Sequence, residues 1–172
     1  MPNHPAQFAP CMQRATAGKV IDPEKQLQSF IDKFEPAHQA TIRAARKKLR
    51  KLFPTATEFA YDNYNFFVIG FGPNDRPSDC IVTIAAAANG VGLCFVRGAS
   101  LPDPAKLLLG SGKQTRFVRL PSADVLDRPE VQALLAGAAE RSQAPLPAAG
   151  RGKLVIRSVS AKQRPRRKQQ KA

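Results

Sequence analysis

The hydrophobic pattern of this chain changes its period at Pro54, and this change limits the fold to classes that place helices against a sheet. Upstream, residues 22–34 and 36–53 repeat apolar side chains at the spacing of amphipathic helices. Downstream, short runs of β-branched and aromatic residues alternate with Gly, Pro, Asn and Asp turns, as is typical of an antiparallel meander. These runs are residues 58–61, 64–71, 80–87 and 91–97.

The two helices carry recognisable end signals. Asp22 stands at an N-cap position before Pro23, and Pro54 ends the second helix because proline cannot donate a backbone hydrogen bond. Helical spacing predicts that one face of each helix is buried. The predicted inward residues are Ile21, Leu27, Phe30, Ile31 and Phe34 in the first helix, and Ile42, Ala45, Leu49, Leu52 and Phe53 in the second.

Asn89 and Gly90 predict a two-residue hairpin turn, which would set Ala88 opposite Val91 and Ala85 opposite Cys94. That register excludes a Cys80–Cys94 disulfide. It also predicts one buried face and one face of smaller side chains. The buried face holds Val82, Ile84, Val91, Leu93 and Phe95, and the other holds Thr83, Ala85, Gly92, Cys94 and Val96.

Further along the chain, residues 115–120 read as a strand, 128–141 as a helix that begins near Pro129, and 153–160 as a weakly alternating segment that can add a strand. The prediction is an α+β fold with two layers, in which helices pack on one face of an antiparallel sheet. The predicted core includes Phe30, Leu49, Phe67, Ile84 and Phe95.

With 172 residues, the chain is expected to form one domain, residues 21–143, after a disordered segment, residues 1–20. Residues 144–172 are expected to form a linker, the possible extra strand and a basic tail. No apolar run approaches the length of a membrane span, no signal peptide is recognisable, and three cysteines give neither a disulfide framework nor a zinc motif. These features predict a cytoplasmic protein without membrane association.

The net charge of +14 is concentrated at the C-terminal end, since residues 144–172 hold nine Lys or Arg and no Asp or Glu. The second helix adds a basic face. Such segments attract phosphates without sequence specificity, although a basic tail can also be merely a solubilising end and a basic helix face merely solvated surface. The candidate nucleic-acid contacts are Arg43, Arg46, Lys47, Arg50, Arg164, Arg166, Arg167 and Lys168.

A glycine-containing loop within residues 101–120 carries the sequence GSGK. It departs from a P-loop, since Leu107 and Gln114 stand where that motif has Gly and Ser or Thr. What remains is a candidate anion site, in which backbone amides lie beside two cations. Its members are Gly110, Gly112, Lys113 and Arg116.

Catalytic constellations are not found in the sequence. His38 is the one histidine of the predicted domain and has no nucleophile spaced to use it. The acids near the first helix, interrupted by lysines, would hold a hard cation only weakly. The residues suggest no catalytic mechanism, so we expect a non-catalytic protein while an enzyme stays open, and we expect no cofactor, with iron as the alternative. A polar patch is a candidate binding site for a small anion or an iron-handling partner, and its members are Glu58, Tyr61, Asp62, Asn63 and Tyr64.

Several segments together resemble the YdhG-like family, over about residues 24–142: the two helices, EFAYDNYNFFVIGFG, LPDPAKLLLGSGKQTRFVRL and DRPEVQALLAGAAE, with KLVIRSVSAKQRPRR similar to one branch. The resemblance implies helices packed on one antiparallel sheet and no established enzymatic activity. Some members are described as frataxin-like, with iron as their cargo. Many members carry Tyr-Gly-x-Pro where this chain has residues 61–64, so a pocket there would differ.

Two function classes stay open at this point: a non-catalytic binding or carrier module, and a nucleic-acid-associated accessory protein. An iron carrier should expose clustered carboxylates, whereas here bases outnumber acids. A nucleic-acid binder should expose aromatic rings for base stacking, whereas the phenylalanines mostly occupy apolar positions.

Overall fold

The computed structural model describes residues 21–169 and has two layers, helices and a six-stranded sheet. The strand order is β5-β4-β3-β2-β1-β6, and all neighbours are antiparallel except β1 and β6. The α+β prediction is confirmed. The elements are α1 (Pro23–Ile31), α2 (Pro36–Leu52), β1 (Thr57–Asp62), β2 (Phe67–Gly72), β3 (Val82–Ala87), β4 (Gly90–Phe95), β5 (Arg116–Arg119), α3 (Pro129–Glu140) and β6 (Leu154–Val159).

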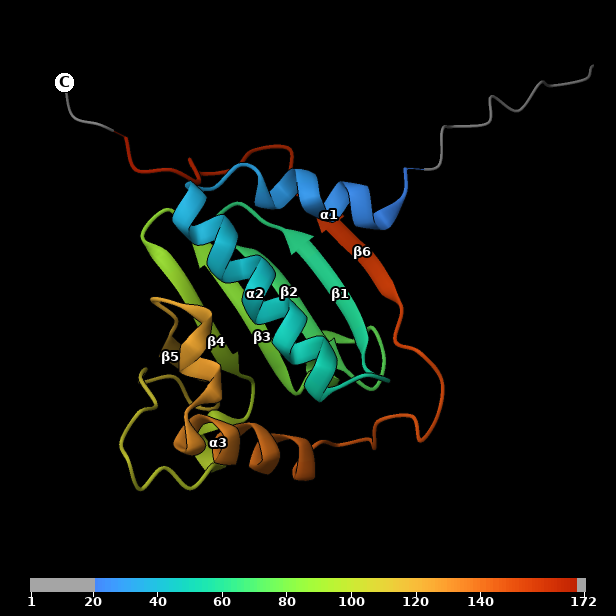
Figure 1. Ribbon diagram of the computed structural model, residues 1–172, viewed down its shortest axis with the longest axis vertical. Helices are drawn as coiled ribbons and strands as arrows, with labels where there is room; N and C mark the ends of the chain where they lie inside the picture. Colours follow the sequence, from blue (N-terminus) through green and yellow to red (C-terminus); the bar gives the residue numbers. More distant parts are fainter. Residues whose placement is uncertain (1–20, 170–172) are drawn as a thin grey trace, which may run out of the picture.

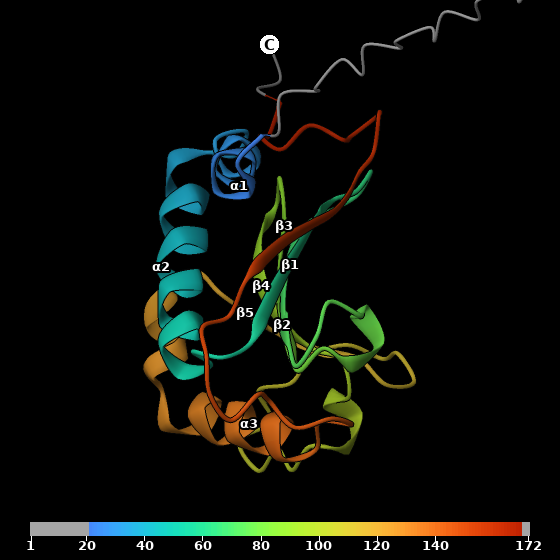
Figure 2. The ribbon, with the colours of Figure 1, turned by 90° about the vertical axis from the view of Figure 1, so that its right-hand side faces the viewer.

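The helices are arranged around one face and the two ends of the sheet. Figure 1 shows α2 running along the strands, and Figure 2 shows α1 and α2 on the same side of the sheet. In both views α3 crosses the end of the sheet opposite α1. All five predicted core residues, Phe30, Leu49, Phe67, Ile84 and Phe95, are at most 5% exposed.

Two expectations at the helix ends were wrong. α1 begins as predicted, with the Asp22 carboxylate accepting the Glu24 amide at 3.1 Å, but Ile21 precedes this cap and is 61% exposed. Leu52 is 42% exposed because Phe53, which caps α2, takes the next inward position. Phe34 lies beyond the end of α1 and is nevertheless fully buried.

The β3–β4 hairpin has a different register from the predicted one. Ala87 pairs with Gly90, so Ala88 and Asn89 form the turn, and Ala85 lies opposite Gly92. Gly90 begins β4 at φ +148°, a conformation that other residues rarely adopt. The shift amounts to two residues, which preserves the faces. The predicted inward residues of β3 and β4 are all buried, and both described cysteines are free.

The β1–β2 connection is a four-residue turn, residues 63–66, closed by the Asn63 amide donating to the Phe66 carbonyl at 2.9 Å. The predicted strand of residues 64–71 therefore starts three residues later, at Phe67.

The C-terminal segment extends the sheet. β6 pairs in parallel with β1, with a bulge beside Ala60, which confirms the extra strand considered for residues 153–160. After β6, residues 160–169 pass over the end of α1, where Figure 1 shows the red chain beside the blue helix. The expected disorder of residues 1–20 lies outside the described residues.

Candidate functional site

A buried ion-pair cluster joins the C-terminal segment to the sheet. Asp62 ends β1 with its side chain only 1% exposed, and its carboxylate accepts from Lys33 Nζ at 2.5 Å and from Arg166 Nη2 at 2.8 Å. Its backbone carbonyl accepts from the Ser160 amide at 2.9 Å and from Gln163 Nε2 at 3.1 Å. A carboxylate this deeply buried requires such partners.

Arg166 also holds the β1–β2 turn in place. Its Nη1 donates to the Asn65 carbonyl at 2.8 Å and its Nη2 donates to the Asn63 carbonyl at 2.5 Å. The guanidinium carbon lies 5.9 Å from the centre of the Phe34 ring. Because Arg166 is itself only 4% exposed, it is a structural residue that fastens the segment to the domain, and it is not free to meet a phosphate.

The neighbouring cations of the segment are exposed. Arg164 donates its amide to the Tyr64 carbonyl at 2.9 Å and lays its guanidinium 5.5 Å from the Tyr64 ring centre. Arg167 Nε donates to the Phe34 carbonyl at 3.1 Å, at the end of α1. We define the turn–tail surface as the exposed residues of this region that carry a ring or a charge: Tyr64, Phe66, Lys162, Arg164, Arg167 and Lys168.

The basic face of α2 carries its own counter-charges. Arg43 pairs with Asp32 at 2.5 Å. Arg50 Nε lies 2.9 Å from a Glu58 oxygen. These pairs reduce the charge that the helix can offer to a polyanion.

Arg46 is the central member of the same face, and it is only 5% exposed. It binds Glu24 at 2.5 Å and Glu58 at 2.7 Å. Its hydrogen bonds lower the pKa of Glu24 to about 2. Two of the sequence-predicted phosphate contacts, Arg46 and Arg166, are thus buried, and Lys47 is exposed without an ion pair to any described carboxylate.

The predicted polar patch is divided between two faces of the sheet. Successive side chains of β1 point to opposite faces of the sheet, so Glu58 and Asp62 share one face and Tyr61 lies on the other. Both carboxylates point toward the helix side, where their partners lie. Tyr61 packs beside Phe59 with ring centres 5.8 Å apart, and burial raises its pKa. Asn63 and Tyr64 belong to the turn. The five residues therefore do not converge on one ligand.

The glycine loop is closed on itself. Leu109 and Phe117 exchange backbone hydrogen bonds that close the loop. Gly110, the first residue inside it, has φ +106°. Arg116 Nη1 donates to the carbonyls of Gly112 and Thr115, so the loop itself holds this guanidinium. Of the predicted anion site, Lys113 remains as an exposed cation that lacks an ion pair within residues 21–169.

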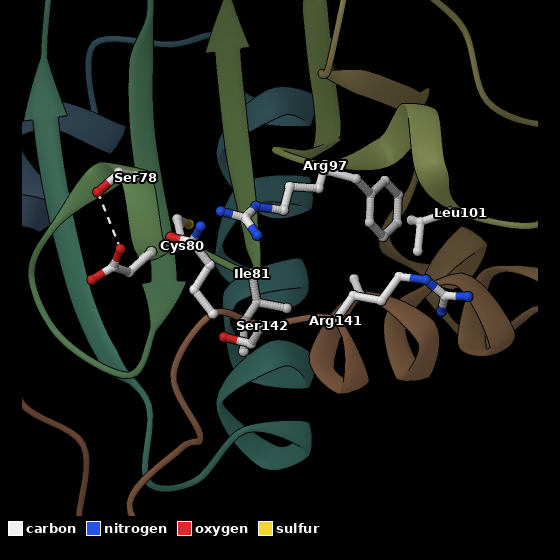
Figure 3. A pocket seen from close by; sticks show the side chains of 11 residues that line it. Ser78, Cys80, Ile81, Arg97, Leu101, Arg141 and Ser142 are labelled. Carbon is white, nitrogen blue, oxygen red and sulfur yellow. Dashed lines mark hydrogen bonds between the residues drawn. The ribbon is translucent and has the colours of Figure 1, made fainter.

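The cysteines lie in apolar surroundings. Burial raises the pKa of the Cys80 thiol to about 12, and its Sγ donates to the Val82 carbonyl at 3.0 Å. Figure 3 shows the small cavity beside it, where the guanidinium groups of Arg97 and Arg141 point in opposite directions. At about 10 Å³ this cavity has room for a single water molecule.

Sequence reasoning missed Phe66 and Lys162, and it did not separate buried from exposed arginines in the tail. Phe66 was assigned to a strand, although Asn63 and Asn65 are turn-forming residues on either side of Tyr64. Asp62 was predicted to belong to a small-anion or partner-binding patch, whereas its carboxylate forms a buried ion pair with Arg166.

Comparison with known proteins finds no matching family model, curated protein or solved structure. The resemblance to the YdhG-like family therefore remains a prediction. Within residues 21–169, no group of three or more His, Cys, Asp or Glu side chains is placed to hold a metal ion. None of the helices in that same range is long and apolar enough to cross a bilayer.

Proposed function

We propose that this protein is a nucleic-acid-associated accessory protein that contacts phosphate groups through its C-terminal segment. The observation that carries the proposal is the set of four exposed cations, Lys162, Arg164, Arg167 and Lys168, none of which forms an ion pair with a described carboxylate. Cations without a carboxylate partner keep their net charge, so they can neutralise phosphates and release the counterions bound there.

The fold supports this use because it orders the segment before any partner binds. Arg166 ties the segment to Asp62 and to the turn carbonyls, while Arg167 ties it to the end of α1. An ordered cationic surface loses less conformational entropy on binding than a free tail does. The paired arginines of α2 make that helix the weaker candidate.

A carrier of a small anion or of iron is less well supported. Arg116 is bound to loop carbonyls, and two of the acids near α1, Glu24 and Asp32, are paired with arginines. Neither a converging set of free amides nor a free carboxylate cluster supports this alternative within the described residues.

Two double variants test the proposed function. Lys162→Ala/Lys168→Ala removes two exposed ammonium groups of the segment, and Lys47→Ala/Lys51→Ala removes two from α2 as a matched control. The binding of a labelled DNA duplex is measured by fluorescence anisotropy at several salt concentrations, with thermal melting as the check on folding.

The tail variant should lower the slope of log affinity against log salt by about 1.8, which in 0.1 M salt is a loss of up to about 60-fold. The control should bind nearly as well as the wild type. An equal or larger loss in the control would move the contact to α2. Wild-type binding that is absent or indifferent to salt would refute the function itself.

A further inference from the structure

We propose, resting on the function proposed above, that the turn–tail surface prefers single-stranded nucleic acid and that Tyr64 and Phe66 stack on unpaired bases. The surface combines aromatic rings with cations, which is the combination that binds single strands independently of sequence.

The exposure of these two rings sets them apart. Tyr64 is 50% and Phe66 is 49% exposed, and every other aromatic side chain in residues 21–169 is buried or half-buried. Both rings belong to one four-residue turn, residues 63–66. The other exposed large apolar residues of that range, Ile21, Leu52, Leu109 and Val159, lie in separate elements or loops.

The turn is built to present these rings in a fixed place. The Asn63 amide closes the turn on the Phe66 carbonyl, and Arg166 binds the carbonyls of Asn63 and Asn65 from below. The Arg164 amide binds the Tyr64 carbonyl at 2.9 Å. Backbone groups that would otherwise need water are satisfied by the segment, so the rings are held without being covered.

One cation of the surface, Arg164, lies directly beside a ring. The Arg164 guanidinium lies against Tyr64, at 5.5 Å from its ring centre, and Tyr64 is still 50% exposed beside it. A base stacked on the exposed part of the ring keeps its own phosphate within the same cationic neighbourhood. In a duplex the bases already stack on one another, so its phosphates can contact the cations but its bases cannot stack on the rings.

The test uses the full chain and three probes: an oligothymidylate and an oligouridylate of about 12 nucleotides, within the usual site size, and a DNA duplex of the same length. Tyr64→Leu/Phe66→Leu keeps apolar bulk without aromatic rings. Tyr64→Phe keeps the ring and serves as the matched control. The chain has no Trp and two Tyr, so quenching of tyrosine emission reports stacking directly.

The double leucine variant should lose affinity for both single strands, by roughly 5- to 150-fold for each ring that stacks, and should keep its duplex affinity. Tyr64→Phe should bind single strands as the wild type does. Oligouridylate in place of oligothymidylate should make little difference, because neither ring reads the sugar.

Three results would overturn the preference: single-strand affinity unchanged in the leucine variant, equal losses on single strands and duplex, or no quenching of tyrosine emission by bound strands. In each of these cases, duplex binding that depends on Lys162 and Lys168 leaves the proposed function standing. If the wild type binds none of the three probes, both the function and the preference fail.

Discussion

At the scale of single residues, the same residue type has opposite roles in this protein. Arg166 is buried with Asp62, whereas Arg164, two residues earlier, is exposed beside Tyr64. Residue type and charge in the sequence are identical for the two arginines. Only the position of the β1 carboxylate in space decides which arginine becomes structural.

Removing one partner of the buried pair should be costly. Arg166→Ala leaves the Asp62 carboxylate with Lys33 as its remaining ion-pair partner, and it should lower the free energy of unfolding by about 3–5 kcal/mol. Lys168→Ala, an exposed change in the same segment, should stay within about 0.5 kcal/mol. Urea unfolding of both variants measures the difference. Equal effects would mean that the segment is not anchored through Asp62.

The Glu24–Arg46 contact should make the stability of the fold depend on pH in the acidic range. The hydrogen bond from Arg46 lowers the folded-state pKa of Glu24 from 4.5 to about 2. When the pKa of a carboxyl group is lower in the folded state, its ionised form stabilises the fold at any pH above the unfolded-state pKa. This contribution is lost as the pH falls toward the folded-state pKa. Glu24→Gln should therefore melt lower than the wild type at pH 7, and the gap should narrow between about pH 5 and 2. A gap that does not change with pH would contradict this role.

At the scale of elements, period and end signals were enough to predict the helices and the buried faces of the hairpin. Asp22 and Pro23 start α1 as expected. A two-residue error in the β3–β4 register left the faces correct, since side chains alternate with a period of two. Long-range pairing could not be predicted in this way: the parallel pairing of β6 with β1 depends on contacts across about half of the chain.

The entry into β6 requires glycine at position 152. Its amide donates to the Pro54 carbonyl at 3.0 Å, and an added Cβ would stand 1.9 Å from the Ala56 carbonyl oxygen. Gly152→Ala should destabilise the protein by about 1–3 kcal/mol, the usual cost of overpacking. Gly112→Ala, with its nearest neighbour at 3.7 Å, is the control. If thermal melting ranks the two variants equally, β6 does not dock against β1 as described.

At the scale of the whole molecule, the fold decides which of the positively charged side chains are paired with carboxylates and which stay exposed. The arginines of α2 pair with acids in or next to α1 and in β1, while four cations after β6 remain exposed, one of them beside the exposed Tyr64 ring. The sequence predicted where the positive charge lies but not which part of it is free. That distinction depends on ion pairs between segments that are far apart in the chain.

The most direct test of this account is a map of amide chemical shifts in the ¹⁵N-labelled full chain, as a single-stranded oligonucleotide is added. The account predicts that the largest changes fall on residues 63–66 and 162–168, with little change on α2. Largest changes on residues 43–51, or on the glycine loop around Lys113, would contradict it.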